Sequence, residues 1–197
     1  YPILVSDSES SDTEERRVEK KPSYVRVYGR GKIECVERLL VCTSMAAAIR
    51  CGIEGLPMEG GTDGLRVDYV PSTSDAVLTV PPRCDAMDLE ALVWDKLRPK
   101  EVRVVMTKEV SSTRGEDGIV YVLGGNDHIY QPLPLGEAID GLVARIITGS
   151  IARKIQITAF VLYHAPHSSS SAILKLADAL KTTGEWKLDL KKVRDGF

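Results

Sequence analysis

The segment from residue 155 to residue 163 reads IQITAFVLY and constrains the fold more than any other part of the chain. It is nearly all apolar, and many of its side chains are β-branched or aromatic, which favours a strand over a helix. A strand that is apolar on both faces has to be covered on both faces. We therefore predict that Ile155–Tyr163 is a central strand of a sheet that lies between two other layers.

Shorter strands precede this one along the chain. They are predicted at Tyr24–Tyr28, Arg38–Thr43, Leu65–Val70, Asp75–Val80, Glu101–Thr107 and Ile119–Leu123. The third and fourth of them are joined only by the turn Pro71–Ser74, so we expect a hairpin there. Strands and helices alternate elsewhere, which favours a mixed sheet between helical layers. The predicted fold class is α/β, with a single three-layer α/β/α domain over residues 23–197.

The helices are placed by capping residues and by apolar spacing. Thr43 or Ser44 can cap a helix over Met45–Cys51 that ends at Gly52, and Asp85 can cap the next helix. The following helix is predicted over Glu137–Thr148, and a polar stretch at 167–171 can cap a later one. The apolar residues of the last three helices keep the spacing of a buried stripe: Leu89, Leu92, Val93 and Leu97; Ile139, Leu142, Val143, Ile146 and Ile147; and Ile173, Leu176, Ala177 and Leu180.

Residues 1–22 differ in composition from everything that follows. The stretch Ser6–Glu15 contains no apolar residue, and a mixed basic stretch and Pro22 follow it. Such a segment cannot offset the entropy lost on ordering, so we expect a disordered acidic arm. Its serines next to acidic residues are candidate phosphorylation sites: Ser6, Ser8, Ser10 and Ser11. The alternative is a solubilising tail without a switch function. Because residue 1 is Tyr, we expect a fragment or a processed product.

Composition excludes several classes of protein. The chain has 26 Lys and Arg against 28 Asp and Glu, so no overall positive field attracts nucleic acid. No apolar run reaches the roughly 18–20 residues that a membrane span needs, and a cytoplasmic or nuclear location is expected. The four cysteines form no C-x-x-C pair and have no histidine at zinc-ligand spacing, so we predict free thiols and no metal site. No cofactor is predicted either.

No motif in the chain predicts catalysis. His164 and His167 follow the central strand, where ligands often bind in α/β proteins, but no carboxylate or cysteine stands at matching spacing. The serines at 168–171 lack a G-x-S-x-G context and are typical of a helix cap. The glycines at 124 and 125 lack the spacing of a dinucleotide fingerprint. We predict no catalytic residue, and keep as an alternative a small-molecule enzyme with a site near Gly124–Asn126 and the two histidines.

A second alternative concerns the first strand and the turn after it. Basic and aromatic side chains alternate there, in a pattern that can bind RNA: Tyr24, Arg26, Tyr28, Arg30 and Lys32. The sequence Gly29-Arg30-Gly31-Lys32 lacks the spacing of a phosphate-binding loop, and a tight turn between strands accounts for it equally well. An RNA-binding or ribosome-associated protein therefore stays open.

The segment Tyr130–Pro166 resembles the late helix–strand unit of the proteasome assembly chaperone family, in particular its first member. In that family a proline-bearing stretch leads into a helix of the type (I/V)-x-G-L-x-A-x-(I/V/L)-L, and a basic or polar linker then leads to an apolar strand. The helix pattern is carried here by Ile139, Gly141, Leu142, Ala144 and Ile146. These are packing residues, and a glycine and an alanine let a helix approach a sheet closely.

The resemblance implies a non-enzymatic chaperone. It would form a heterodimer with a related chaperone and bind proteasome α subunits while the core particle assembles. Members of the family can end in a hydrophobic residue, a tyrosine and any third residue, a tail that docks on the proteasome α ring. This sequence ends in Asp195-Gly196-Phe197, which lacks the pattern, so the alternatives are that the partner subunit supplies the docking tail or that the chain is truncated.

Overall fold

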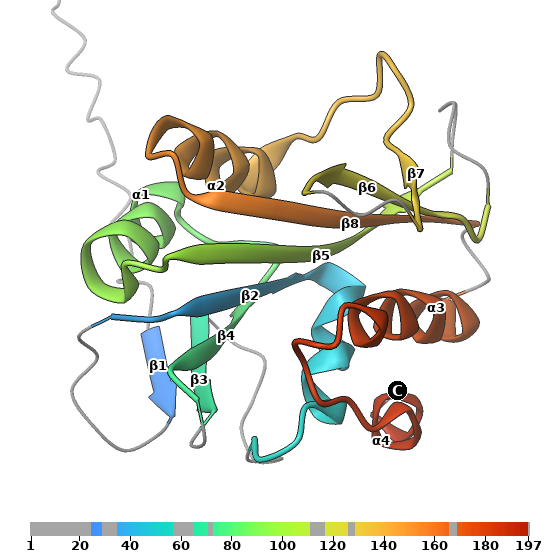
Figure 1. Cartoon of the computed structure of the whole chain (residues 1–197), viewed down its shortest axis with the longest axis horizontal. Coiled ribbons are helices and arrows are strands. Elements are labelled where there is room, and N and C mark those ends of the chain that lie inside the picture. The colour runs from blue at the N-terminus through green and yellow to red at the C-terminus, as the bar shows by residue number, and fades with distance from the viewer. Residues whose placement is uncertain are drawn as a thin grey trace, which may run out of the picture.

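The computed structural model describes residues 25–28, 35–56, 65–70, 73–110, 117–125, 129–165 and 169–196. Its centre is an eight-stranded mixed sheet in the order β1-β3-β4-β2-β5-β8-β6-β7 (Figure 1). The strands are β1 Val25–Tyr28, β2 Arg38–Thr43, β3 Leu65–Val70, β4 Asp75–Val80, β5 Glu101–Glu109, β6 Val120–Gly124, β7 Gln131–Pro132 and β8 Gln156–His164.

The middle of the sheet is parallel. β4, β2, β5 and β8 run in one direction, and β8 pairs with β5 over nine residues, from Glu101–Gln156 to Glu109–His164. Strand β3 pairs antiparallel with β4, which confirms the predicted hairpin, and β6 pairs antiparallel with β8. The longest apolar segment of the sequence therefore lies between two paired strands, and the prediction of a central strand at 155–163 is confirmed.

Helical segments connect the strands. They are the 3-10 helix η1 Ser44–Gly52, α1 Ala86–Glu90, the π-helix η2 Ala91–Leu97, α2 Gly141–Ala152, α3 Ser169–Thr182 and α4 Leu190–Asp195. The predicted cap at Asp85 is confirmed, since its carboxylate accepts a 2.8 Å hydrogen bond from the Met87 backbone nitrogen. The predicted helix after Thr43 is a 3-10 helix, and Thr43 makes no side-chain cap bond to it.

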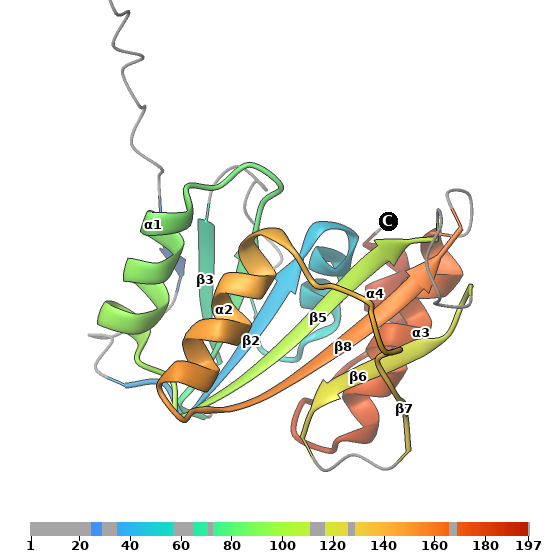
Figure 2. The same ribbon diagram turned by 90° about the horizontal axis from the view of Figure 1, so that it is seen from above.

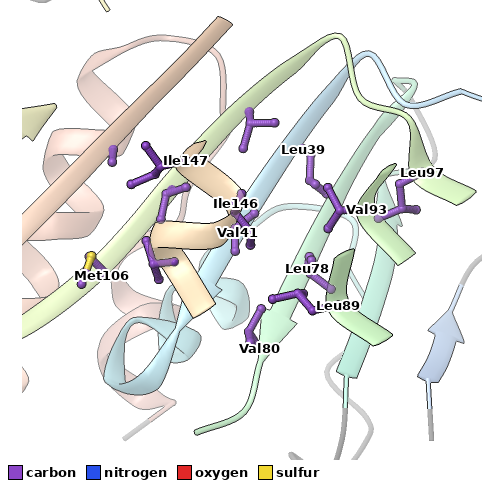
Figure 3. Close-up of a cluster of buried hydrophobic side chains, with 14 of the residues drawn as sticks. Leu39, Val41, Leu78, Val80, Leu89, Val93, Leu97, Met106, Ile146 and Ile147 are labelled. Atoms are coloured by element: carbon purple, nitrogen blue, oxygen red, sulfur yellow. The ribbon is translucent and has the colours of Figure 1, made fainter. Parts of the chain in front are cut away.

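The helices cover the sheet on both sides (Figure 2). The face covered by α1, η2 and α2, here the α2 face, holds the odd-numbered side chains of β2 and the even-numbered ones of β4 and β5, such as Val41, Leu78 and Val104. Figure 3 shows part of this cluster beneath the helices. The opposite face, here the α3 face, is covered by η1, α3 and α4 and buries residues such as Leu40 and Phe160. The alternation of side chains across each strand thus produces the predicted three-layer α/β/α fold.

Helix α2 differs from the prediction in the residue at which it begins and in the glycine that packs closely against a neighbour. It begins at Gly141 rather than at Glu137, because Asp140 is in an extended conformation and Gly141 has a φ of +64°. A Cβ at Gly141 would meet nothing within 4 Å, so the expected close approach at this glycine is wrong. The close contact is made by Gly149, where a Cβ would lie 2.7 Å from the Trp94 ring. What position 141 requires is the left-handed conformation that glycine adopts readily.

Several predictions fall outside the described residues. They concern the arm at 1–22 with its four serines, the turn at 29–32, most of the glycine-rich stretch at 55–64, and His167. None of the helices in the described part of the chain has the length and apolar character to cross a bilayer.

Candidate protein-binding surface

His164 lies at the end of β8 and is held by local contacts. The residue is 7% exposed, and its Nδ1 lies 2.9 Å from the carbonyl oxygen of Ala165. Its own carbonyl accepts a 2.9 Å hydrogen bond from the Val110 backbone nitrogen. Within the described ranges, no three His, Cys, Asp or Glu side chains are grouped so that they could hold a metal ion. The observed surroundings of His164 are those of a packed residue at a strand end.

Two of the four cysteines have surroundings that suppress the thiolate form. All four are free, and Cys42 is fully buried, so that desolvation raises the pKa of its thiol. Burial, followed by the nearby carboxylates of Asp88 and Asp85, raises the pKa of Cys84 to about 11. A raised pKa removes thiolate at neutral pH, and the thiolate is the reactive form. Neither Cys42 nor Cys84 has the properties of a nucleophile.

The two glycines at the end of β6 allow close packing. Gly124 and Gly125 have φ values of +76° and +73°. A Cβ at Gly124 would lie 2.5 Å from the Ile157 carbonyl oxygen, and one at Gly125 would lie 2.5 Å from the hydroxyl of Thr158. Both glycines therefore let β6 end against β8. In the RNA hypothesis, Tyr24, Arg30 and Lys32 lie outside the described residues, and β1 places Arg26 and Tyr28 on the edge strand of the sheet.

A buried ionic cluster joins η1 to β3 on the α3 face. Asp68 is fully buried and accepts hydrogen bonds from Arg50 Nε at 2.6 Å and from Arg66 Nε at 2.8 Å. Burial acts to raise the pKa of Asp68, but the hydrogen bonds from Arg66 and Arg50 outweigh it and lower the pKa. The sequence gives no sign of this cluster, because Arg50 and Asp68 belong to elements that only the fold brings together.

A second ionic network lies near the amino ends of β4, β2 and β5. Arg38 donates to both carboxylate oxygens of Asp75, at 3.0 and 2.6 Å, and Arg103 donates in the same way to Glu185. The Arg38 guanidinium also lies 5.7 Å from the centre of the buried Trp186 ring. These paired contacts hold the segment before α4 against the sheet, and they have the character of structural interactions.

Three large exposed apolar side chains come from β6 and from the segments on either side of β7. Leu123 in β6 is 37% exposed, Ile129 before β7 is 71% exposed, and Leu135 after β7 is 89% exposed. We call these three residues the β7 edge patch. Figure 1 shows β7 and the segment after it at the border of the molecule. Large exposed apolar side chains are candidate contacts for a protein partner.

The five residues of the family-like helix pattern differ in how deeply they are buried. Ile146 in α2 is fully buried, and Ile139 and Leu142 are partly buried against the same cluster. Ala144 is partly buried and Gly141 is exposed. The motif therefore fixes α2 on the sheet and does not itself make a contact surface. The β7 edge patch was not predicted, although Leu135 gave a signal: it is a lone leucine between Pro134 and Gly136, outside any helical or strand spacing.

Comparison with known proteins reveals likeness of fold. No protein-family model matches the chain, and no curated protein has significant sequence similarity to it. A protein of unknown function from Thermoplasma acidophilum superposes with a TM-score of 0.60 at 13% identity, over 98% of this chain and 91% of that one.

Two further solved structures have more informative descriptions. A proteasome-assembly chaperone homologue from Mycobacterium tuberculosis superposes with a TM-score of 0.52 at 11% identity, over 80% of this chain and 89% of that one. A PAC2 family protein from Streptomyces avermitilis gives a TM-score of 0.53 at 11% identity, over 81% and 91% of the two chains. At these identities the shared property is the fold.

Proposed function

We propose that this protein is a non-enzymatic assembly chaperone that binds proteasome α subunits during assembly of the core particle, as a heterodimer with a related chaperone. The observation that carries the proposal is the coincidence of two likenesses. The segment 130–166, which resembles the proteasome assembly chaperone family, forms β7, α2 and β8, and the fold around it is shared with a proteasome-assembly chaperone homologue.

The β7 edge patch supports a protein partner. Leu123 lies in β6, and Ile129 and Leu135 lie just before and just after β7, at the end of the strand order where the segment with the family resemblance begins. When a partner removes such exposed apolar side chains from water, their burial contributes a favourable free energy of binding. The contacts of His164 and the raised thiol pKa values of Cys42 and Cys84 add no catalytic group. These features together favour binding over catalysis.

Purification of the full chain from a native cell extract at moderate salt tests the proposal. We expect proteasome α subunits and a second chaperone of related sequence to co-purify, as identified by mass spectrometry. A folded protein that recovers neither of them contradicts the proposal. Recovery of ribosomal proteins or RNA instead, in a salt-dependent manner, would support the RNA hypothesis.

Two matched variants locate the contact surface. Leu135→Asp places a charge in the β7 edge patch, whereas Ile151→Asp places the same charge on α2, where Ile151 is 64% exposed and distant from the patch in sequence. We expect Leu135→Asp to lose the co-purifying subunits and Ile151→Asp to retain them. Loss in both variants, or in neither, would assign the contact to another surface. Circular dichroism spectra of both variants establish that they fold.

A further inference from the structure

The connection between β7 and α2 presents a single leucine on a tight turn. The Glu137 backbone nitrogen donates a 3.1 Å hydrogen bond to the Pro134 carbonyl oxygen, and Gly136, the third residue of the turn, has a φ of +87°. This is the arrangement of a type II turn, which favours glycine at the third position. Leu135 is the second residue and is 89% exposed. Figure 1 shows the connection after β7 as an arch that projects from the rest of the molecule.

The turn is held on its amino-terminal side by β6. Pro132 pairs with Val122, and the Leu133 backbone nitrogen donates a 2.9 Å hydrogen bond to the Val122 carbonyl oxygen. Pro132 and Pro134 also fix their own φ angles, which removes conformational freedom from the segment. The turn therefore leaves the sheet from a fixed starting point.

The turn is held on its carboxyl-terminal side by Glu137. The Glu137 carboxylate accepts a 2.8 Å hydrogen bond from the Tyr163 hydroxyl in β8 and a 3.2 Å hydrogen bond from Lys108 Nζ in β5. Lys108 Nζ also donates to the Ala138 carbonyl oxygen at 2.7 Å. The Glu137 side chain is 8% exposed and Tyr163 is fully buried, so water competes little for these bonds. Two neighbouring strands thus hold the residue that closes the turn.

The partners of Glu137 are themselves fixed in place. Burial, followed by the hydrogen bond and the negative charge of Glu137, raises the pKa of the Tyr163 hydroxyl, which therefore stays protonated and remains a donor. The Tyr163 ring packs edge to face against Tyr121, with 5.4 Å between the ring centres, and Lys108 Nζ lies 5.8 Å from the centre of the Tyr163 ring. A carboxylate between such partners has few alternative positions.

The residues around Leu135 determine which kind of partner the turn fits. The segment from Gln131 to Gly136 contains no charged residue, so it offers a partner no ion pair. A leucine on a turn that is already ordered loses little conformational entropy on binding, and burial of its side chain contributes a favourable free energy. Both properties suit an apolar pocket that receives one side chain.

We propose that Leu135 inserts into an apolar pocket on a proteasome α subunit and that Glu137 is the positioning residue that holds the turn in its binding conformation. This inference rests on the proposed function. It narrows the β7 edge patch to one anchoring side chain and adds Glu137, which acts on binding without touching the partner. A Glu137 that served only the stability of the fold would not act through Leu135.

A double-variant comparison tests the proposal. The affinity for the α subunits that co-purify with the unmodified chain is measured for that chain, Leu135→Ala, Glu137→Ala and the double variant. We expect Leu135→Ala to weaken binding by about tenfold or more, because burial of the leucine is lost. Glu137→Ala should weaken it by about threefold to tenfold, because binding then has to order the turn. The double variant should bind within about twofold of Leu135→Ala, and losses that multiply overturn the positioning role.

Two matched variants separate the turn from general stability. Glu137→Gln keeps an oxygen that accepts from the Tyr163 hydroxyl and should recover most of the affinity. Glu37→Ala breaks the exposed ion pair with Lys100, at the opposite end of β5 from Lys108, and should leave the affinity unchanged. If Glu137→Ala binds as tightly as the unmodified chain, this inference is overturned and the proposed function stands. If the unmodified chain recovers no α subunits, both fail.

NMR relaxation measures the order of the turn without a partner. We expect backbone order parameters of about 0.85 at Leu135 and Gly136 in the unmodified chain and below about 0.6 in Glu137→Ala. A turn that is already flexible in the unmodified chain overturns the proposal. If Glu137→Ala fails to fold, Gly136→Ala takes its place in the comparison, because it disfavours the same turn at a positive φ.

Salt dependence tests the chemistry of the pocket. The loss of affinity caused by Leu135→Ala should be the same at about 0.1 M and about 0.5 M salt, because salt does not screen the burial of an uncharged side chain. A loss that disappears at the higher salt concentration would assign the contact to charged groups and would overturn the apolar pocket.

Discussion

The two faces of the central sheet are covered by helices in the same way but are stabilised by different chemistry. On the α2 face, the side chains beneath α1, η2 and α2 form one apolar cluster that extends from Leu65 in β3 to Tyr163 in β8. On the α3 face, an apolar cluster is joined by the fully buried Asp68 and its two arginine partners, Arg50 and Arg66.

The two faces differ in how strictly they fix the positions of their helices. Apolar packing tolerates changes of side chain when volume is kept, whereas a buried ion tolerates no displacement of its partners. The triad of Arg50, Asp68 and Arg66 therefore fixes where η1 lies against the β3–β4 hairpin. On the α2 face the Glu137 carboxylate is also nearly buried, but it lies before α2 and binds Lys108 and the Tyr163 hydroxyl. Beneath α1, η2 and α2 the described side chains form an apolar cluster, so these helices are positioned by shape. Substitutions on the two faces should therefore change the free energy of unfolding in different ways.

Asp68→Ala should have the largest effect. It leaves Arg50 and Arg66 buried without their carboxylate, and we expect a loss of about 3–5 kcal/mol in the free energy of unfolding. Urea unfolding followed by circular dichroism measures it, with Asp195→Ala, an exposed position in α4, as the control. A loss below about 1 kcal/mol would mean that the triad behaves like a surface ion pair.

The pH dependence of the same carboxylate gives an independent check. The pKa of Asp68 is lowered in the folded protein, so its contribution is present above its unfolded pKa of about 3.9 and is lost as pH falls through the lower folded value. We expect the unmodified protein to lose stability more steeply than Asp68→Asn as pH falls below about 4. Parallel curves for the two proteins would contradict the lowered pKa.

Ile146→Ala tests the apolar face. The side chain is fully buried under α2, and its truncation should cost about 3 kcal/mol through lost burial and the cavity left behind. The same urea experiment measures it, and Ile146→Val should cost clearly less because most of the volume remains. A similar loss for both substitutions would show that the site does not depend on filled volume.

Gly149→Ala tests the close contact on the same face. An added methyl group would lie 2.7 Å from the Trp94 ring and would force α2 and η2 apart, at a cost of about 1–3 kcal/mol. Unfolding followed by tryptophan fluorescence reports both stability and the surroundings of the ring. If the substitution stabilises the protein instead, the helices can separate without loss and the fit is looser than it appears in the structure.

The smallest change is expected at the cap of α1. Asp85→Ala removes the hydrogen bond to the Met87 backbone nitrogen, and we expect a loss of about 1 kcal/mol. Asp85→Ser retains an oxygen that can accept this bond and should recover most of the stability. Equal losses in both variants would mean that the charge, rather than the hydrogen bond, is what matters at this position.

The sequence predicts the α2 face better than the α3 face, for a physical reason. The bounds of β2 and the buried stripe of the α1–η2 helix follow from periodicity, which is a local property. The start of α2 was missed because Ile139 continues the apolar stripe although residues 137–140 are not helical and Asp140 is extended. In β3 the alternation placed Leu65, Val67 and Tyr69 on one face correctly, but it gives no indication that Arg66 and Asp68 on the other face meet Arg50 rather than water.

The candidate sites depend even more on the fold. Motif spacing alone led to the prediction that the chain has no catalytic residue. The β7 edge patch could not be predicted in this way, because its residues come from β6 and from both sides of β7. The Glu137 carboxylate likewise meets Lys108, 29 residues earlier, and Tyr163, 26 residues later. Such proximity arises only from strand order, which local patterns do not determine.

The shortness of β7 has a consequence for how the molecule meets other chains. β7 covers β6 only at Tyr121 and Val122, and its second residue, Pro132, has no N–H to offer. An incoming strand would therefore find at most one main-chain donor on β7, too few to extend the sheet. Growth into fibres by edge-to-edge addition is disfavoured on this side. A partner that approaches here has to recognise side chains, which lets it distinguish this protein from any other exposed sheet.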